Sequence, residues 1–417
     1  MLAAYRTSAI IVIGAALLQF SNGLLGVLLP LRLAEAGTSD TQIGLIVSAY
    51  GLGFLIGCLR ASLLIRAVGH IRAFSALAAM CAATTLLFLV TEQPLVWMAL
   101  RFVTGLGLAG LFSVVEGWLA AATTNEARGR VVGFYLVATK VSTVAGQVLT
   151  GLGTLGTASM FTLAAGAFSI ALIPVALTPT PAPARPRTVS LELGTLWRIA
   201  PAALVGCVAA GLLNSAVGGL LPVWGSSLGV PTGLIVTLLS TMQLGSLVLQ
   251  WPLGWLSDRI DRRQVILACA GVVIVLSAAI ALLGNGSDAL LLALFLGWGA
   301  FSMSFYGICV AHAADHARPD QMVGVSSGGL FAWASGTAVG PVLAAPMMEL
   351  MGPSGLFVYA TVVAAVLAAF TGWRMTIRGP VPVDAREPFV NLPATSPRLA
   401  EIDPRGAGPE RAGQAAQ

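Results

Sequence analysis

Long runs of apolar residues alternate with short polar segments along most of the chain. A helix needs about 20 apolar residues to cross a bilayer, and about twelve runs reach that length. The first six lie near residues 8–33, 41–65, 72–91, 94–121, 129–152 and 156–177. The second six lie near residues 198–225, 232–256, 264–284, 287–314, 321–350 and 353–375. The pattern predicts an all-α membrane protein with about twelve transmembrane helices in two pseudo-symmetric halves of six.

Two polar segments divide this pattern. Residues 178–190 read TPTPAPARPRTVS, and so many prolines exclude a continuous helix. We therefore expect an N-terminal half over residues 1–177, a cytoplasmic Pro-rich linker over 178–197 and a C-terminal half over 198–377. Residues 378–417 are polar, rich in Pro, Gly and Ala and poor in aromatic residues, which predicts a disordered cytoplasmic tail.

The composition excludes most soluble proteins. The chain is 57% hydrophobic and 9% charged, whereas soluble domains carry about 25% charged residues. The net charge of +5 does not indicate nucleic-acid binding, because the basic residues lie between apolar runs and form no stripe. The five cysteines all lie inside apolar runs without metal-binding spacing, so we expect free thiols and no metal site.

Basic residues occupy every second loop. These loops contain Arg66, Arg72, Arg128, Arg130, Arg185, Arg187, Arg259, Arg262, Arg263, Arg318, Arg374 and Arg378. The other loops contain Glu35, Asp40, Glu92, Asp288 and Glu349, with Arg32 as almost their only basic residue. Because loops rich in Lys and Arg stay in the cytoplasm, we expect a multi-pass protein of the cytoplasmic (inner) membrane with both termini inside.

Three short motifs resemble those of the major facilitator superfamily. Residues 254–263 read GWLSDRIDRR, similar to the family's G-x-x-x-D-R-x-G-R-R loop, with Asp261 in place of the glycine. Residues 101–109 read RFVTGLGLA, similar to R-x-x-x-G-x-x-x-A, and residues 128–130 read RGR. The equivalent loop of the first half carries Arg66 where the acidic residue is expected. The resemblance covers about residues 5–378 and implies a transporter with two six-helix halves.

The resemblance also implies roles for these loops. In the family, this loop locks helix ends together in the outward-facing state, so Asp258, Arg259 and Arg262 are expected to form a cytoplasmic gate, with Arg66, Arg128 and Arg130 as the further basic residues. Proton-driven drug antiporters of the family carry a Gly-Pro pair in the fifth span. Here residues 131–151 contain no proline, and Gly340-Pro341 lies in the eleventh span instead, which weakens the inference to drug export.

Charged side chains inside the spans are the first candidates for mechanism. A charge at mid-membrane costs at least about 2.5–3.5 kcal/mol, so its retention indicates a function. Lys140, the only lysine, lies near the middle of the fifth span, and Gln147 lies seven residues further on the same helix face. Lys140 is interpreted as a substrate contact or a titrating group, with a structural ion pair or a carbonyl-capped lysine as the alternative.

Glu116 and Arg101 both lie in the fourth span. A carboxyl group in an apolar environment favours its neutral form, which a proton carrier needs. Glu116 is therefore interpreted as a proton carrier, with an equally weighted alternative as a gate partner of Arg66, Arg128 or Arg130. The resemblance of the Arg101 motif to the family pattern implies a role in the cavity or in proton coupling, with a purely structural role as the alternative.

Neutral polar residues in other spans predict a central cavity. Their amide and aromatic groups belong to Gln19, Asn22, Asn214, Gln243, Tyr306 and Trp333. Each alone is more often an interhelical hydrogen-bonding or packing residue, but as a set they converge at similar depth.

Together these features predict a secondary active transporter that moves a small organic solute by alternating access. No nucleotide-binding G-x-x-x-x-G-K-[ST] motif is present, so a proton gradient is the expected energy source. Lys140 and Arg101 favour a solute with an anionic or strongly polar group. Export of drug-like compounds and import of a metabolite both stay open, and a non-transporting sensor is the alternative from another class.

We expect no enzyme activity, no cofactor and no nucleic-acid partner. The expected partners are the solute, protons and the lipid bilayer, with the protein as a monomer.

Overall fold

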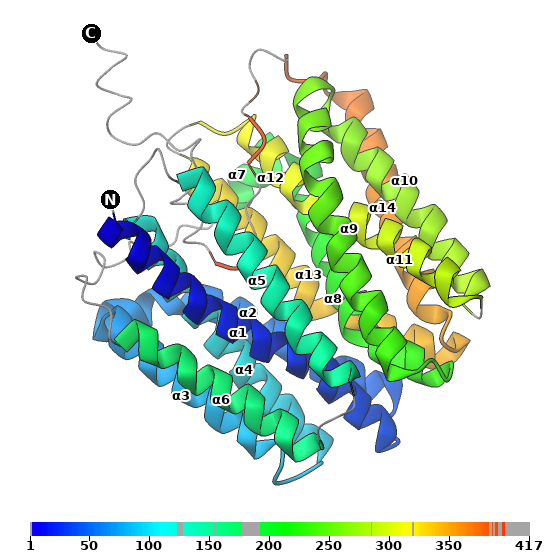
Figure 1. Ribbon diagram of the computed structural model, residues 1–417. Coiled ribbons are helices and arrows are strands. Elements are labelled where there is room, and N and C mark those ends of the chain that lie inside the picture. Colours follow the sequence, from blue (N-terminus) through cyan, green and yellow to red (C-terminus); the bar gives the residue numbers. More distant parts are fainter. Residues whose placement is uncertain are drawn as a thin grey trace.

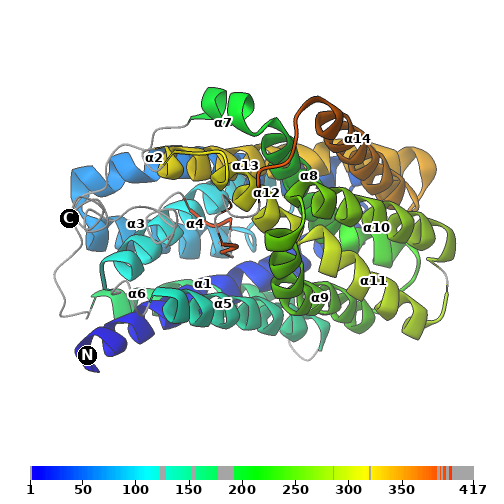
Figure 2. The same ribbon diagram turned by 90° about the horizontal axis from the view of Figure 1, so that it is seen from above.

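The computed structural model describes residues 2–122, 128–152, 156–176, 192–284, 286–318, 321–382, 386, 388–390 and 394–396, and these contain helices but no strands. The first half comprises α1 (Leu2–Glu35), α2 (Asp40–Val68), α3 (His70–Leu87), α4 (Pro94–Ala122), α5 (Arg128–Gly151) and α6 (Thr157–Ala176). The second half comprises α7 (Leu193–Ile199), α8 (Pro201–Ser227), α9 (Thr232–Arg259), α10 (Arg262–Leu283), α11 (Asp288–Ser302), α12 (Phe305–Ala314), α13 (Met322–Met351) and α14 (Gly355–Ile377). The two halves lie side by side in Figures 1 and 2.

The fold class predicted from the apolar runs is confirmed. Twelve stretches of the described residues are long and apolar enough to cross a membrane. The helices α11 and α12 form one of these stretches, Asp288–Ala314, which is interrupted at Met303 and Ser304. The helix α7 is too short to span a membrane and precedes α8.

The two polar segments are described only in part. Residues 178–191 of the expected linker lie outside the described residues, and its residues 193–197 belong to α7. The segment after α14, for which disorder is the prediction, is described only at residues 378–382, 386, 388–390 and 394–396. These residues contact α9 at Asp258 and α4 at the buried Glu116 through hydrogen bonds.

Glycine contacts repeat in the two halves and reveal their common architecture. A Cβ atom on Gly23 of α1 would lie 2.2 Å from Thr143 O of α5, and one on Gly146 of α5 would lie 2.1 Å from Phe20 O of α1. In the second half, Gly211 of α8 and Gly336 of α13 approach each other's helices in the same way. Such close backbone approach is typical of helix packing in lipid, where small residues replace the hydrophobic driving force.

A second pair of crossings follows the same rule. Gly53 of α2 and Gly105 of α4 each face the partner's backbone, and so do Gly245 of α9 and Gly299 of α11. Spans one and five, and spans two and four, of the first half therefore correspond to spans seven and eleven, and spans eight and ten, of the second.

The halves contact each other closely at one end of the bundle. We call this end, which carries the loop between α1 and α2, the α1–α2 side, and the other end the α2–α3 side. A Cβ atom on Gly44 of α2 would lie 2.4 Å from Ala345 Cβ of α13, and one on Gly51 would lie 2.8 Å from the Ala338 backbone. The Val342 N–H donates a hydrogen bond of 3.1 Å to Ser48 Oγ across the same boundary. This small-residue seam closes the α1–α2 side between α2 and α13.

Candidate functional site

A cavity of about 300 Å³ lies between the two halves. Its walls come from α1 and α5 of the first half and from α8, α9, α12 and α13 of the second. The lining residues are Gln19, Asn22, Tyr135, Leu136, Thr139, Lys140, Thr143, Asn214, Gln243, Ser246, Gln250, Met303, Tyr306, Trp333, Ala394 and Thr395. Seven of the ten predicted pathway residues line this cavity: Gln19, Asn22, Lys140, Asn214, Gln243, Tyr306 and Trp333.

Lys140 joins the two halves across the cavity. Its Nζ donates a hydrogen bond of 2.7 Å to Oε1 of Gln243, which lies on α9. Within the described part of the chain, Lys140 makes no ion pair with any carboxylate. The alternative of a structural ion pair therefore has no support among the described residues, and the ammonium group is available to an anionic ligand in the cavity.

Amide and aromatic groups supply the rest of the polar wall. Asn22 donates a hydrogen bond of 3.2 Å to Gln19 Oε1 on the same helix. Asn214 Oδ1 is buried without a hydrogen-bond partner among the described residues, so it is free to accept one from a solute or from water. Trp333 lies beside Tyr306, with ring centroids 6.2 Å apart, which adds a flat apolar surface.

Glu116 lies on α4 and is completely buried. Its Oε1 accepts a hydrogen bond of 2.8 Å from the Tyr135 hydroxyl of α5, and the hydroxyls of Thr395 and Ser396 also donate to the carboxylate. It makes no ion pair with Arg66 or Arg130, and the Arg128 side chain lies outside the described residues. Tyr135 and Thr395 line the cavity, so Glu116 lies behind its wall and is joined to it by hydrogen bonds from these two side chains.

Arg101 and Gln147 lie outside the cavity wall. The Arg101 guanidinium lies 4.5 Å from the centre of the Tyr50 ring, and its Nη1 has no hydrogen-bond partner among the described residues. Gln147 Oε1 is likewise buried without a described partner. Both groups retain unused hydrogen-bonding capacity in the first half, but neither contacts the cavity in this conformation.

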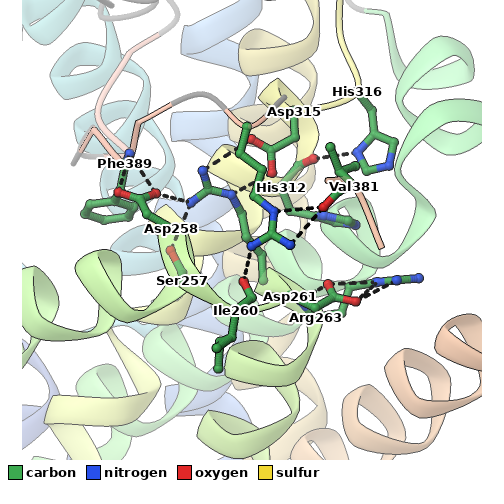
Figure 3. Close-up of polar contacts among 12 residues, drawn as sticks. Ser257, Asp258, Ile260, Asp261, Arg263, His312, Asp315, His316, Val381 and Phe389 are labelled. Carbon is green, nitrogen blue, oxygen red and sulfur yellow. Dashed lines mark hydrogen bonds and ion pairs between the residues drawn. The ribbon is translucent and has the colours of Figure 1, made fainter. Parts of the chain in front are cut away.

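The loop between α9 and α10 contains a buried ion-pair cluster. Arg262 is 1% exposed and donates to Asp315 at the end of α12 through Nε (2.7 Å) and Nη2 (3.2 Å). Its Nη1 lies 3.0 Å from Asp258 Oδ1 and 2.9 Å from Ser257 Oγ. Arg262 thus binds the ends of α9 and α12 to the start of α10 (Figure 3).

Asp261 caps the start of α10. Its Oδ1 accepts from the Arg263 backbone N–H at 3.0 Å, and its Oδ2 lies 2.6 Å from Arg263 Nη2. Burial raises the pKa of Asp261, but the hydrogen bonds and the charge of Arg263 outweigh it, so the pKa lies below its ordinary value. This acid replaces the glycine of the family pattern, and it stabilises the helix start through its side chain.

Of the six residues expected at the gate, the Arg128 side chain lies outside the described residues, and the other five do not form one network in the described structure. Asp258 and Arg262 form an ion pair, but within one half. Arg259 stacks over the Trp255 ring at 3.5 Å from its centre, and Arg66 and Arg130 are exposed. None of these three makes an ion pair in the described structure.

Several residues of the site escaped the sequence analysis. Tyr135, Thr139, Ser246 and Gln250 line the cavity without having been singled out. Asp315, which the sequence places with His312 and His316 in a cytoplasmic gate network after the tenth span, pairs with Arg262. Tyr135 had a detectable signal, because it precedes Lys140 by five residues in the same predicted span. The contact of Thr395 with Glu116 had none, because 279 residues separate the two.

Comparisons with known proteins agree with this architecture. The Major Facilitator Superfamily sequence model matches residues 11–341. An uncharacterised MFS-type transporter of Enterobacter sp. (strain 638) is 28% identical over 363 residues, covering 87% of this chain and 94% of that protein. The uncharacterised MFS-type transporter YcaD of Escherichia coli O45:K1 (strain S88 / ExPEC) is 27% identical, covering 85% and 92%.

Solved structures show the same fold at low sequence identity. The nucleoside transporter NupG superposes with a TM-score of 0.74 and 11% identity, covering 90% of this chain and 99% of that one. A bacterial homologue of the human lysosomal transporter Spinster, in an inward-facing and occupied conformation, gives a TM-score of 0.71 with 13% identity over 92% and 98% of the two chains. The family match covers most of the chain, and its two six-span halves enclose a polar cavity: the chain belongs to the major facilitator superfamily.

Proposed function

We propose that this protein is a secondary active transporter for a small polar organic solute that carries an anionic group. The observation that supports this most directly is Lys140, which stands in the cavity between the halves with an amide as its only described polar contact. An ammonium group without a carboxylate partner in an apolar medium is costly unless a ligand or water compensates its charge.

The proposed mechanism is alternating access about this cavity. The seam between α2 and α13 closes the α1–α2 side, so the conformation described here is the one in which that side is shut. We assign the α2–α3 side to the cytoplasm, because Arg66, Arg72 and Arg259 lie there, and basic loops remain cytoplasmic. This orientation makes the present conformation inward-facing in a cytoplasmic membrane.

Glu116 is the proposed proton carrier. A fully buried carboxyl group without a described cationic partner is stabilised by protonation, and a passing proton reaches it through Tyr135 at the cavity wall. The gate alternative for Glu116 lacks a described arginine partner, which is why proton coupling is the preferred role.

The polar wall favours a metabolite over a drug-like compound. Broad export of amphipathic compounds calls for a mostly apolar cavity, whereas this one presents amides at Gln19, Asn22, Asn214 and Gln243. Transport, rather than sensing or catalysis, is also supported by the relatives, which are named as transporters.

A flux measurement tests this proposal. The protein is reconstituted into vesicles containing a pH-sensitive dye, and organic anions, zwitterions, cations and neutral polar solutes are applied under gradients of either direction. We expect a proton flux with anionic or zwitterionic solutes, and its loss in Glu116→Gln to the level of protein-free vesicles. Glu35→Gln, an exposed carboxylate at the end of α1, is the matched control and should leave the flux unchanged.

Two outcomes would revise the assignment. Solute-dependent flux that persists in Glu116→Gln would remove Glu116 from proton coupling while retaining the transporter. Flux of cations that exceeds that of anions, with Lys140→Gln unchanged, would contradict the assigned charge of the solute.

A further inference from the structure

The chain after α14 returns to the mouth of the cavity on the α2–α3 side. Its first anchor is Arg386, whose Nε and Nη2 donate to Val381 O at 3.0 and 2.8 Å and whose Nη1 donates to Ile260 O. Ile260 lies in the loop between α9 and α10, so this anchor attaches the segment to the ion-pair cluster of the second half.

Phe389 provides a second anchor on the same half. Its backbone N–H donates to both carboxylate oxygens of Asp258, at 3.0 and 3.1 Å (Figure 3). Its ring lies directly against Gly254, where a Cβ atom would come within 2.2 Å of Phe389 Cδ1. The glycine of the loop motif therefore leaves the space that this ring occupies.

The third anchor lies on the first half, inside the cavity. The Thr395 and Ser396 hydroxyls donate to Glu116, one to each carboxylate oxygen, and Ser396 is 3% exposed. Ala394 and Thr395 form part of the cavity wall. In Figure 1 the described part of this segment, drawn in orange-red, lies between helices of the two halves.

We propose that the described residues of this segment, 386, 388–390 and 394–396, form an autoinhibitory plug and that the cavity mouth is its docking site. The segment contacts α9 of one half and α4 of the other, so it fixes the separation of two parts that must move relative to each other during alternating access. It also occupies Asp258 of the loop motif and Glu116, the proposed proton carrier. Transport then requires the segment to leave, and a solute in the cavity competes with it.

The docking site recognises the segment by simple chemistry. Two adjacent hydroxyls satisfy both oxygens of a buried carboxylate, an aromatic ring fills the space above a glycine, and a backbone N–H caps an aspartate. Asp258 pairs with Arg262, so the Phe389 N–H bonds to a charged acceptor. Such a hydrogen bond is about twice as strong as a neutral one, which favours the docked state. The inference depends on the proposed function only for its consequence for transport, since the docking itself is independent of any solute.

The test measures cysteine accessibility in the full-length chain. The native cysteines among the described residues are all buried, so their background labelling by a membrane-impermeant thiol reagent should be slow. Leu136→Cys places a reporter in the cavity wall, and Arg72→Cys places an exposed control on the same side of the bundle. Labelling is followed in vesicles whose α2–α3 side faces the reagent.

Releasing the plug should expose the reporter. In a background of Phe389→Ala, Thr395→Val and Ser396→Ala, the docked state loses two hydrogen bonds to Glu116 and the packing of an aromatic ring against Gly254. We therefore expect Leu136→Cys to label at least about tenfold faster. Thr376→Val, a matched loss of a hydroxyl at the end of α14, should not change the rate. An unchanged Leu136→Cys rate, with Arg72→Cys labelling normally, would overturn the proposal.

A second measurement leaves the plug intact. Ala394→Cys, inside the cavity, should label at least about tenfold more slowly than Gly379→Cys, which lies exposed directly after α14 and outside the plug, if the docked state is at least about tenfold more populated than the free one. Equal rates would overturn the proposal. Neither measurement uses a solute. Equal labelling rates in either comparison would therefore refute the plug without affecting the transport proposal, and an absence of solute flux would not affect the plug.

Discussion

The two halves carry equivalent loops, after spans two and eight, that are built in opposite ways. At the junction of α9 and α10, Asp258 of α9 and Asp315 at the end of α12 hold the buried Arg262, and Asp261 caps α10. Between α2 and α3, Gly69 alone makes the turn, with φ of 85°, and Arg66 is exposed without an ion pair among the described residues. One loop is held by side-chain electrostatics, and the other by backbone conformation.

This difference shows that pseudo-symmetric repeats can diverge at their mechanistic loops while the helix crossings stay alike. The glycine contacts of α1 with α5 and of α8 with α13 match, although the loops do not. The second-half loop is therefore the one that can store and release electrostatic energy during the transport cycle. The following substitutions, ordered by expected effect, test that contrast.

Arg262→Ala should have the largest effect. It leaves the side chain of Asp315, which is 2% exposed, without its cation, and breaking a buried pair in this way costs about 3–5 kcal/mol. The thermal midpoint in detergent should fall strongly. Arg66→Ala, at the equivalent place in the first half, should leave it within experimental error. Similar losses for both variants would show that the two loops are equally restrained.

Gly69→Ala tests the other loop. The backbone there, with φ of 85° and ψ of 166°, lies in a region open almost only to glycine, so we expect a loss of about 1–3 kcal/mol. Gly271→Ala is the control, because that glycine lies in helix α10 with open space around it. The control should gain up to about 1 kcal/mol, since alanine favours helix. A neutral Gly69→Ala would mean that the turn adopts another conformation.

Asp261→Ala should have a smaller and pH-dependent effect. Loss of an N-cap costs about 0.5–2 kcal/mol. Because the folded-state pKa of Asp261 lies below its ordinary value, its contribution is present above the unfolded-state pKa of about 4 and is lost as the pH falls through the folded-state value. The difference in thermal midpoint between wild type and variant should be larger at pH 7 than at pH 3. A difference independent of pH would exclude the ionised carboxylate as its source.

Arg259→Ala should have the smallest effect. Its guanidinium stacks on Trp255 at the surface, and such an exposed cation–π contact contributes about 0.5–1 kcal/mol. Arg259→Lys should restore part of it. A loss comparable with that of Arg262→Ala would place Arg259 in the buried cluster rather than beside it.

The sequence predicted the spans well, because hydrophobic thickness imposes a length that apolar runs such as 264–284 must reach. It also predicted Gln19, Lys140 and Gln243 as cavity residues, since polar groups inside a span need a partner or water. It did not predict the hydrogen bond between Lys140 and Gln243. It also did not predict that Arg262, rather than Arg259, forms the buried ion pair with Asp315. Those facts depend on the rotation and tilt of helices, which hydrophobic length does not determine.

The small-residue seam between α2 and α13 has a thermodynamic consequence. At Gly44, Gly51 and Ser48 the two halves gain dispersion contacts and a hydrogen bond only while the α1–α2 side is shut. A transporter that populates both of its conformations must recover a comparable free energy on the other side when this seam opens. A larger residue at either glycine would therefore change the ratio of the two conformations, and with it the apparent affinity for solute measured from each side of the membrane.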